Sequence, residues 1–337
     1  MSRLLLFNTD LELGGTPEVL RQVERQLRAA GHRVEVACLG RHGPVAEQIA
    51  DQGGTVTAFD RRARGVFDAV GDLHELVDDH GVTHVLSFLV HANVVAHLAA
   101  KRRPGVRWFQ SVQTTQPYPR WHWWLQRFAH RRAERVICPS QSVADHAMAA
   151  SGIPATKLTV IPNGVERVAE SVSVSGTLPM RVGFLGRLDP VKRVHLLIES
   201  TRDLPGVTLD VFGDGPDLAR LELLGHGRFH GMVPRDDALA RLDVLVLPSL
   251  AEGMPMVLLE AMAAGVVVVA FDVPGCRDVV RDGENGVLTS PTELRSVLAE
   301  LRDDAGRRER LAGGGLATAE GYRWRSIAGR YTEVLGL

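Results

Sequence analysis

The chain alternates short apolar runs with longer helix-like stretches, and it does so in two successive series. In the first series the apolar runs are RLLLFNT, HRVEVACL, VTAF, HVLSFL, VRWFQSV and ERVICPS. Such alternation is typical of βαβ units, in which a helix carries the chain back to the next parallel strand. The pattern therefore predicts an α/β fold with parallel sheets.

The second series starts with MRVGFLGR and continues through VTLDVFG, GRFHG, DVLVLPS, GVVVVAFD and DGENGVL. Between the two series, residues 166–180 are small and polar and have no apolar period, as in a linker. A length of 337 residues is comfortable for two cores. We predict an N-terminal Rossmann-like domain over 1–165, a linker, and a C-terminal Rossmann-like domain over 181–315. A final helix over 316–337 is predicted to pack back on the first domain.

Charge and cysteine content narrow the function classes. The formal net charge is -1, so no global field attracts nucleic acid, and any basic site must be local. Cys38, Cys138 and Cys276 are far apart, which argues against disulfides or a zinc site and fits a reducing compartment. The first apolar run is too short for a signal peptide, and no run approaches the roughly 20 residues of a membrane span. We expect a soluble, cytoplasmic protein.

The segment DVLVLPSLAEGMPMVLLEAMAAG carries the first candidate site. A strand leads into a loop with Glu252 and Gly253, and Pro255 stands where the first helical turn is expected. A helix N-terminus attracts phosphate, and glycine lets a ligand approach the backbone closely. Glu260, roughly 7.5 Å along the helix, is placed to accept hydrogen bonds from a ribose. Alternatively, both glutamates are solvated residues of a helix start.

The segment GFLGRLDPVKRVHLLIES carries the second candidate site. We expect Asp189 to cap a helix whose first turn contains Lys192 and Arg193, where cations oppose the helix dipole. A local rule broken in this way often marks a functional position. Arg187 and Lys192 beside a diphosphate would reverse the penalty. The alternative is a surface basic pair.

Taken together, Arg187, Lys192, Glu252, Glu260 and VIPNGVE (160–166) resemble family 4 of the retaining glycosyltransferases. The resemblance implies the GT-B fold, two facing Rossmann-like domains with a cleft between them. It covers nearly the whole chain, and the other matching segments are Gly14–Gly15, CPSQSVADH (138–146), VFGDGPD (211–217), FHGMVP (229–234) and VRDGENGVL (280–288).

The resemblance also implies a role for each matching residue. Arg187 and Lys192 would bind the diphosphate of a UDP- or GDP-type sugar donor, and Glu260 would hold the ribose. The donor-sugar hydroxyls would be held by Glu252 and the backbone of Gly253, Met254 and Pro255. Gly14 and Gly15 would close over the donor from the opposite domain. The backbone from His230 to Val233 would meet the nucleobase.

The departing diphosphate is negatively charged, and something cationic must stabilise it. The sequence contains no Asp-x-Asp motif, by which many transferases hold a metal ion. Arg187, Lys192 and the helix N-termini can supply the positive charge instead. We therefore expect a transferase that needs neither metal nor cofactor. Retention of the anomeric configuration is implied by the family alone.

One departure from the family concerns the first domain. Many members have a histidine close to the reacting sugar, and the residue aligned with it here is Gln113. Glutamine forms hydrogen bonds but cannot act as a general acid or base. His91, which also follows a predicted strand, is placed to take that polar role and joins the catalytic set. A structural role for His91 is the alternative.

Residues 101–135 are strongly basic, with nine lysines and arginines against Glu134 alone, and they contain four of the five tryptophans. Arginines attract anionic lipid, and tryptophan settles at the headgroup boundary. One interpretation is that the protein docks on the inner face of a membrane and glycosylates a lipid-linked acceptor. The other is that the tryptophans are core, the arginines an ordinary solvated face, and the acceptor a soluble sugar.

Three other functions fit Rossmann-like domains. A nicotinamide-dependent oxidoreductase is disfavoured, because Gly213-x-Gly215 lacks a third glycine at Leu218 and the first strand lacks the fingerprint altogether. A sugar-nucleotide epimerase of the same fold remains an alternative. So does a non-catalytic sugar-nucleotide-binding protein, for which Gln113 is the best argument.

Overall fold

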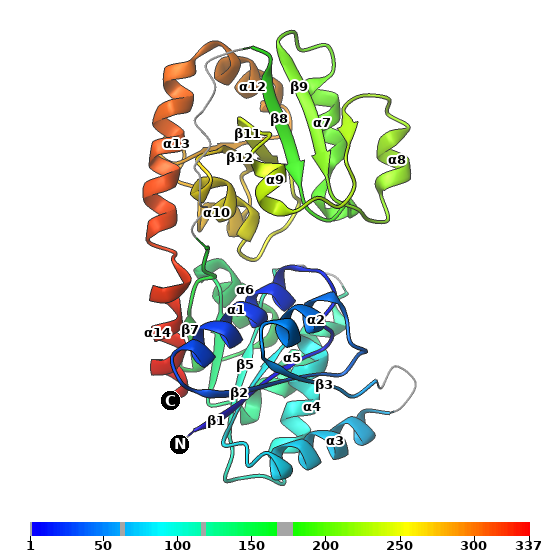
Figure 1. Cartoon of the computed structure of the whole chain (residues 1–337), viewed down its shortest axis with the longest axis vertical. Helices are drawn as coiled ribbons and strands as arrows, with labels where there is room; N and C mark the ends of the chain where they lie inside the picture. The colour runs from blue at the N-terminus through cyan, green and yellow to red at the C-terminus, as the bar shows by residue number, and fades with distance from the viewer. Residues whose placement is uncertain (1, 61–64, 116–118, 167–177) are drawn as a thin grey trace. The chain divides into compact units, whose positions relative to one another are not determined.

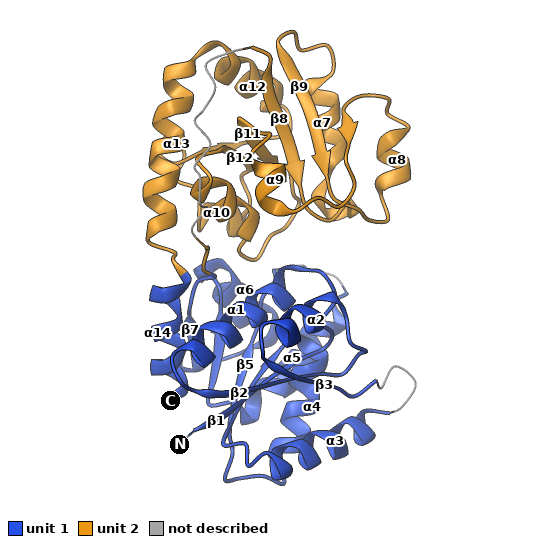
Figure 2. Ribbon diagram, viewed as in Figure 1, with its two compact units in different colours: residues 1–163, 324–337 blue, residues 164–323 orange. Residues whose placement is uncertain are grey.

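The computed structural model describes residues 2–60, 65–115, 119–166 and 178–337 (Figure 1). The chain forms two compact units (Figure 2): unit 1 comprises Met1–Asn163 and Trp324–Leu337, and unit 2 comprises Gly164–Arg323. Most of the predicted linker lies outside the described residues. The predicted terminal helix over 316–337 is divided: residues 316–323 belong to unit 2, and only Trp324–Leu337 belong to unit 1.

Unit 1 contains a parallel sheet of seven strands in the order β3-β2-β1-β4-β5-β6-β7. The strands are β1 (Arg3–Asn8), β2 (Arg33–Cys38), β3 (Thr55–Ala58), β4 (His84–Phe88), β5 (Arg107–Ser111), β6 (Arg135–Cys138) and β7 (Leu158–Val160). Each described pair of neighbours is parallel. The first six strands coincide with the six apolar runs of the first series, and β7 was not predicted.

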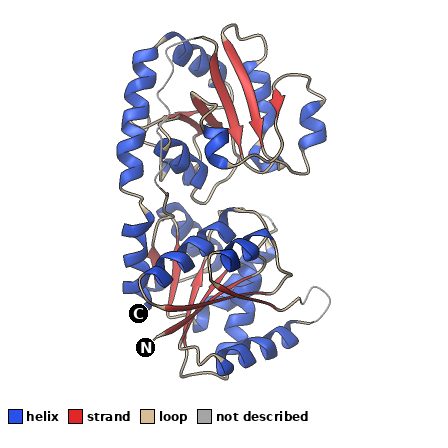
Figure 3. Cartoon of the chain, viewed as in Figure 1, coloured by secondary structure: helices blue, strands red, loops and turns tan. Residues whose placement is uncertain are grey.

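Helices cover both faces of this sheet (Figure 3). They are α1 (Gly15–Ala29), α2 (Pro44–Asp51), α3 (Val66–Asp79), α4 (Val90–Ala100), α5 (Trp121–Ala129), α6 (Gln141–Ser151) and α14 (Trp324–Leu335), with short 3₁₀ turns η1 (His130–Arg132) and η2 (Ala155–Lys157). Leu5 and Phe7 of β1 pack in one core with α3 and α4. Helix α14 contacts α1, so the end of the chain completes unit 1.

Unit 2 contains a parallel sheet of six strands in the order β10-β9-β8-β11-β12-β13. The strands are β8 (Met180–Leu185), β9 (Val207–Phe212), β10 (Arg228–Phe229), β11 (Val244–Leu247), β12 (Val267–Phe271) and β13 (Val287–Thr289). Strands β11 and β12 are apolar at every position because both of their faces are buried. The first five runs of the second series contain strands. The sixth, DGENGVL, is mostly a turn, and only its last two residues belong to β13.

The helices of unit 2 are η3 (Pro190–Lys192), α7 (Val194–Thr201), α8 (Leu218–Glu222), α9 (Arg235–Leu239), α10 (Met256–Ala263), α11 (Pro274–Arg277), α12 (Leu294–Asp303) and α13 (Ala305–Glu320). One large aliphatic core fills this unit. Two all-parallel α/β units confirm the predicted fold class.

Candidate functional site

The order of strands in unit 2 reverses between β8 and β11. From β8 the chain continues to β9 on one side, whereas β12 lies beyond β11 on the other. In open α/β sheets, ligands bind at the carboxyl ends of the strands at such a switch point. The two loops that start there are joined by a hydrogen bond from the Leu250 N–H to the Val191 carbonyl, 2.8 Å long.

The loop after β8 differs in detail from the prediction. The Asp189 carboxylate accepts the Val191 N–H at 3.2 Å and caps the 3₁₀ turn η3 rather than an α-helix. Arg193 then adopts a left-handed conformation with φ of 52°, and α7 starts only at Val194. Lys192 and Arg193 therefore precede the helix, and the argument from an opposing helix dipole was wrong. The position of Lys192 is determined by the 3₁₀ turn, not by the start of an α-helix.

Lys192 and Glu252 meet across the switch point. The Lys192 ammonium donates to a Glu252 carboxylate oxygen at 2.6 Å, and the two side chains are 23% and 10% exposed. One residue comes from the loop after β8 and the other from the loop after β11. Two segments that the sequence identified separately thus form one charged cluster. Arg187, at the head of the first loop, is largely exposed, and its guanidinium lies 3.7 Å from Asp189.

Glu260 lies one turn into α10, as predicted, and its carboxylate accepts Arg235 Nη1 at 2.9 Å. Arg235 starts α9 and also bonds Asp236. Burial lowers the pKa of Arg235, but the attraction of Glu260 and Asp236 outweighs it and raises the pKa above its ordinary value. Sequence reasoning missed Arg235, because an arginine at a helix start belongs to no motif that we used.

Glycines hold the loops of this site close together. A Cβ on Gly275, just after β12, would lie 2.3 Å from the Glu252 carbonyl oxygen and 2.5 Å from that of Gly253. A Cβ on Gly213 would lie 1.9 Å from the Gly186 carbonyl oxygen. Any side chain at these positions would push the loops apart. Gly275 is a second residue that the sequence did not single out.

The segment expected to meet a nucleobase follows β10. The His230 ring stacks on Phe212 with centroids 4.6 Å apart, and its Nε2 lies 2.7 Å from the Asp210 carboxylate. The Gly213 N–H donates to the Gly231 carbonyl at 2.7 Å. The imidazole is therefore held against the sheet. Val233 is half-buried against the core of unit 2.

Unit 1 has its own switch point, between β1 and β4. Gly14 and Gly15 follow β1 at the start of α1, and His91 follows β4 in the first turn of α4. Leu89, which precedes that helix, has φ of 66° and ψ of 156°, a region that costs a non-glycine residue about 1–3 kcal/mol. Such strain often accompanies a functional position.

His91 belongs to an aromatic cluster. Its ring centroid lies 5.7 Å from that of Trp121 and 5.3 Å from that of His122. Burial lowers the pKa of His91, and the Asp10 carboxylate opposes this only in part. The ring is therefore neutral near pH 7. Gln113 lies beyond the end of β5, and its amide nitrogen donates to the Ser111 hydroxyl at 2.6 Å.

A buried amide network anchors α4 and α5 to the sheet. Asn93 Nδ2 donates to Gln126 Oε1 at 3.0 Å, and Gln126 Nε2 donates to Gln110 Oε1 at 3.0 Å. Gln110 Nε2 in turn donates to the Ala129 carbonyl at 2.8 Å. All three side chains are almost fully buried. The network thus fixes which side of α5 faces inward.

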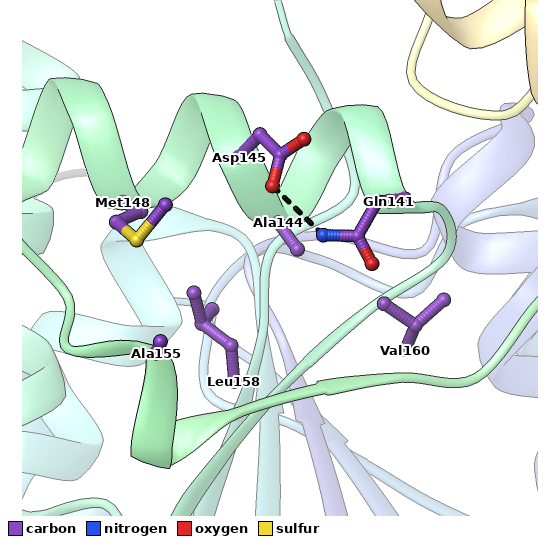
Figure 4. Close-up of a pocket in the computed structure, with 7 residues that line it drawn as sticks. All are labelled: Gln141, Ala144, Asp145, Met148, Ala155, Leu158 and Val160. Carbon is purple, nitrogen blue, oxygen red and sulfur yellow. Dashed lines mark hydrogen bonds between the residues drawn. The ribbon is translucent and has the colours of Figure 1, made fainter.

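Unit 1 also contains a pocket between α6 and β7 (Figure 4). Gln141 Nε2 donates to Asp145 at 2.7 Å on one wall, and Met148, Leu158 and Val160 line the rest. Its volume, about 190 Å³, is below the roughly 300 Å³ of a typical small-molecule site. None of the residues predicted to bind substrate lines this pocket.

In the part of the chain that the structure describes, no cluster of three or more His, Cys, Asp or Glu side chains is arranged to hold a metal ion. Within the same residues, no helix combines the length and apolarity needed to cross a membrane.

Two family models match the chain. The model for Glycosyltransferase Family 4 matches residues 13–167, and the model for Glycosyl transferases group 1 matches residues 179–304. The structure of Anabaena Alr3699/HepE in complex with UDP-glucose superposes with a TM-score of 0.87 over 100% of both chains. At 22% identity, this likeness supports the fold.

Sequence relatives agree with the family models. The sulfoquinovosyl transferase SQD2 of Arabidopsis thaliana is 30% identical over 60% of this chain and 44% of its own length. A GDP-mannose-dependent alpha-mannosyltransferase of Mycolicibacterium smegmatis is 32% identical over 64% of this chain and 61% of its own. The chain thus spans about half the length of these curated relatives. Since the two family models together match both units, the chain belongs to the glycosyltransferases that they describe, family 4 and group 1.

Proposed function

We propose that the protein is a retaining, metal-independent glycosyltransferase that moves a sugar from a UDP- or GDP-type donor to a hydroxyl acceptor. The observation that carries the proposal is the charged cluster at the switch point of unit 2, where Lys192 from one loop meets Glu252 from the next at 2.6 Å. The named ligands of two similar proteins, UDP-glucose and GDP-mannose, support a donor of this class.

The cluster explains how the donor would be held. Arg187 and Lys192 supply two positive charges for the diphosphate, and the α10 N-terminus adds backbone N–H groups. When phosphate oxygens engage Lys192, its carboxylate partner is released toward the donor-sugar hydroxyls. Glu260, held by Arg235, is then positioned for the ribose. The ion pairs of the ligand-free protein would thus hold each side chain close to the position that it takes when the donor is bound.

The reaction would proceed as follows. The bond from the anomeric carbon to the diphosphate oxygen breaks, and its electron pair remains on the diphosphate. Arg187 and Lys192 stabilise the charge that develops there, a contribution typically worth on the order of 10²–10³ in turnover. The acceptor hydroxyl forms the new bond, and its proton passes to the departing diphosphate. Retention follows from the family resemblance, and His91 or Gln113 of unit 1 would position the acceptor.

One experiment tests both transfer and the metal-free mechanism. Purified protein is incubated with UDP- and GDP-sugars, and released nucleoside diphosphate is measured with and without EDTA. With water as the acceptor, we expect slow release from one donor class, nearly unchanged by EDTA. NMR of the freshly released sugar, recorded before it mutarotates, should show the donor's anomeric configuration. Loss of activity in EDTA with rescue by Mg²⁺ would refute metal independence. Tight binding without any release would favour a non-catalytic sugar-nucleotide-binding protein, and a changed sugar still attached to its nucleotide would indicate an epimerase.

A further inference from the structure

Helix α5 has apolar side chains on its outer side as well as its inner side. Trp121, Trp124 and Phe128 are spaced three and four residues apart, so they share one side of the helix. Their exposed fractions are 50%, 61% and 39%. The opposite side, which includes Trp123 and Gln126, is buried against the rest of unit 1. Packing in the core therefore explains the apolar residues on one side of α5, but not those on the side that faces solvent.

The outer face continues onto α4. Between the two helices lies an open groove of about 340 Å³, which is lined by Val94, His97, Leu98, Trp124, Leu125, Phe128 and Ala129. Nearly all of these side chains are apolar. A contiguous apolar patch with a polar rim usually marks a binding surface rather than an ordinary exterior.

The rim of this patch is positively charged. The Arg131 guanidinium lies 4.7 Å from the centre of the Phe128 ring, and Arg132 donates to His97 Nε2 at 2.7 Å. Arg127 stands on the exposed side of α5. Among the residues that the structure describes, no carboxylate forms an ion pair with any of these three arginines.

The structure shows which part of the basic segment 101–135 belongs to this face. Trp108 and Trp123 are buried, so half of the four tryptophans belong to the core. Arg103 is paired with Asp78, and Arg107 with Glu134. The outer face of α4 and α5, which we define as Leu98, Trp121, Trp124 and Phe128 with Arg127, Arg131 and Arg132, consists of exposed side chains.

We propose that this outer face docks on the surface of an anionic lipid bilayer. Tryptophan and phenylalanine partition to the boundary between headgroups and acyl chains, and arginines bind the lipid phosphates around them. A second copy of the chain is a poorer occupant, because a two-fold interface would bring the positively charged rims of both copies together. Charge complementarity therefore selects an anionic surface.

Docking would also decide the class of acceptor, a consequence that rests on the proposed function. Trp121 lies on the outer face of α5, and its ring contacts that of His91, which we place near the acceptor. A bilayer bound to the outer face would bring lipid headgroups to the carboxyl edge of the unit 1 sheet. The acceptor hydroxyl then belongs to a lipid headgroup or to a sugar attached to a lipid.

Vesicle flotation tests the docking directly. Wild-type protein should float with vesicles of phosphatidylcholine and phosphatidylglycerol at low salt, and should remain below with phosphatidylcholine alone. The variant Arg127→Glu/Arg131→Glu should lose binding by on the order of a hundredfold, since each charge near the surface contributes to the attraction. Arg310→Glu/Arg325→Glu is the matched control, with two exposed arginines outside this face, and should float like the wild type.

The apolar part is tested by Trp124→Ser beside Leu223→Ser, a similarly exposed apolar side chain in unit 2. Only the first should weaken flotation. Wild type that does not float, equal loss in the control variants, or a dimer that Trp124→Ser dissociates would each overturn the proposal. Binding of nucleoside diphosphate by all four variants, measured in parallel, separates failure of docking from failure of the proposed function.

Discussion

Replacing Lys192 by methionine removes the cation at the switch point and keeps most of the side chain's volume. Glu252 is then left 10% exposed without its partner 2.6 Å away. Removing one partner of a buried ion pair costs about 3–5 kcal/mol. Lys192 is itself 23% exposed, and Glu252 has further interactions, so we expect the lower figure of about 2 kcal/mol. For a unit of this size, that corresponds to a fall in Tm of about 4–8 °C.

The same change should lower kcat for donor turnover by on the order of 10²–10³-fold, since one preorganised group that stabilises the leaving charge is lost. The double variant Lys192→Met/Glu252→Gln separates the two effects. Its neutral pair should regain most of the lost stability, measured by thermal unfolding, while turnover remains low. If Lys192→Met keeps more than about half of the wild-type kcat, or if the double variant restores it, Lys192 does not stabilise the leaving group.

Further predictions concern the ribose carboxylate, the acceptor side and acid stability. Glu260→Gln should raise the donor KM by about 10–100-fold, which corresponds to the usual free energy of hydrogen bonds to a charged group. Arg235→Ala should raise the donor KM less, and Arg235→Lys should recover part of that loss. An unchanged KM in Glu260→Gln would exclude the ribose role. His91→Ala should reduce kcat more than Gln113→Ala if His91 has the polar role, and the reverse order would make His91 structural. Burial lowers the pKa of six histidines in unit 1, so the folded state binds fewer protons than the unfolded state below pH 6.5. The free energy of unfolding of unit 1 should therefore be highest above pH 6.5 and should decrease as the pH falls below it. All five tryptophans lie in unit 1, so urea unfolding followed by tryptophan fluorescence at pH 7.5 and pH 5.5 reports this unit, and equal midpoints would contradict the prediction.

The sequence predicted the strands well for a physical reason. Parallel strands buried on both faces are continuous apolar runs, as in VLVL of β11. Strand β7 was missed because it is a half-buried edge strand of only three residues, too short to stand out as a separate apolar run. Asp189 caps a 3₁₀ turn instead of the expected α-helix, because Arg193 adopts a left-handed conformation that interrupts the helix. An arginine in the sequence does not indicate such a conformation.

Sequence reasoning singled out residues that belong to a local motif and passed over residues that act only through contacts distant in sequence. Lys192 and Glu252 were each found from local features, and parallel topology explains why they meet. Arg235 and Gly275 had no local signal. Arg235 matters because its side chain reaches Glu260, 25 positions along the chain, and Gly275 because the Glu252 carbonyl lies against its Cα. Likewise, only the fold separates the buried Trp108 and Trp123 from the exposed Trp121 and Trp124.

The most direct test of the central claim, that unit 2 binds the diphosphate of a nucleotide-sugar donor, is nucleotide-dependent stabilisation. Wild type and Lys192→Met are unfolded thermally in titrations with UDP, GDP and ADP. At 100 times its dissociation constant, the cognate nucleoside diphosphate should stabilise the wild type by about 2.7 kcal/mol. The account predicts that one of the three does so and that the effect is largely lost in Lys192→Met. No stabilisation by any of them, or equal stabilisation of both proteins, would contradict it.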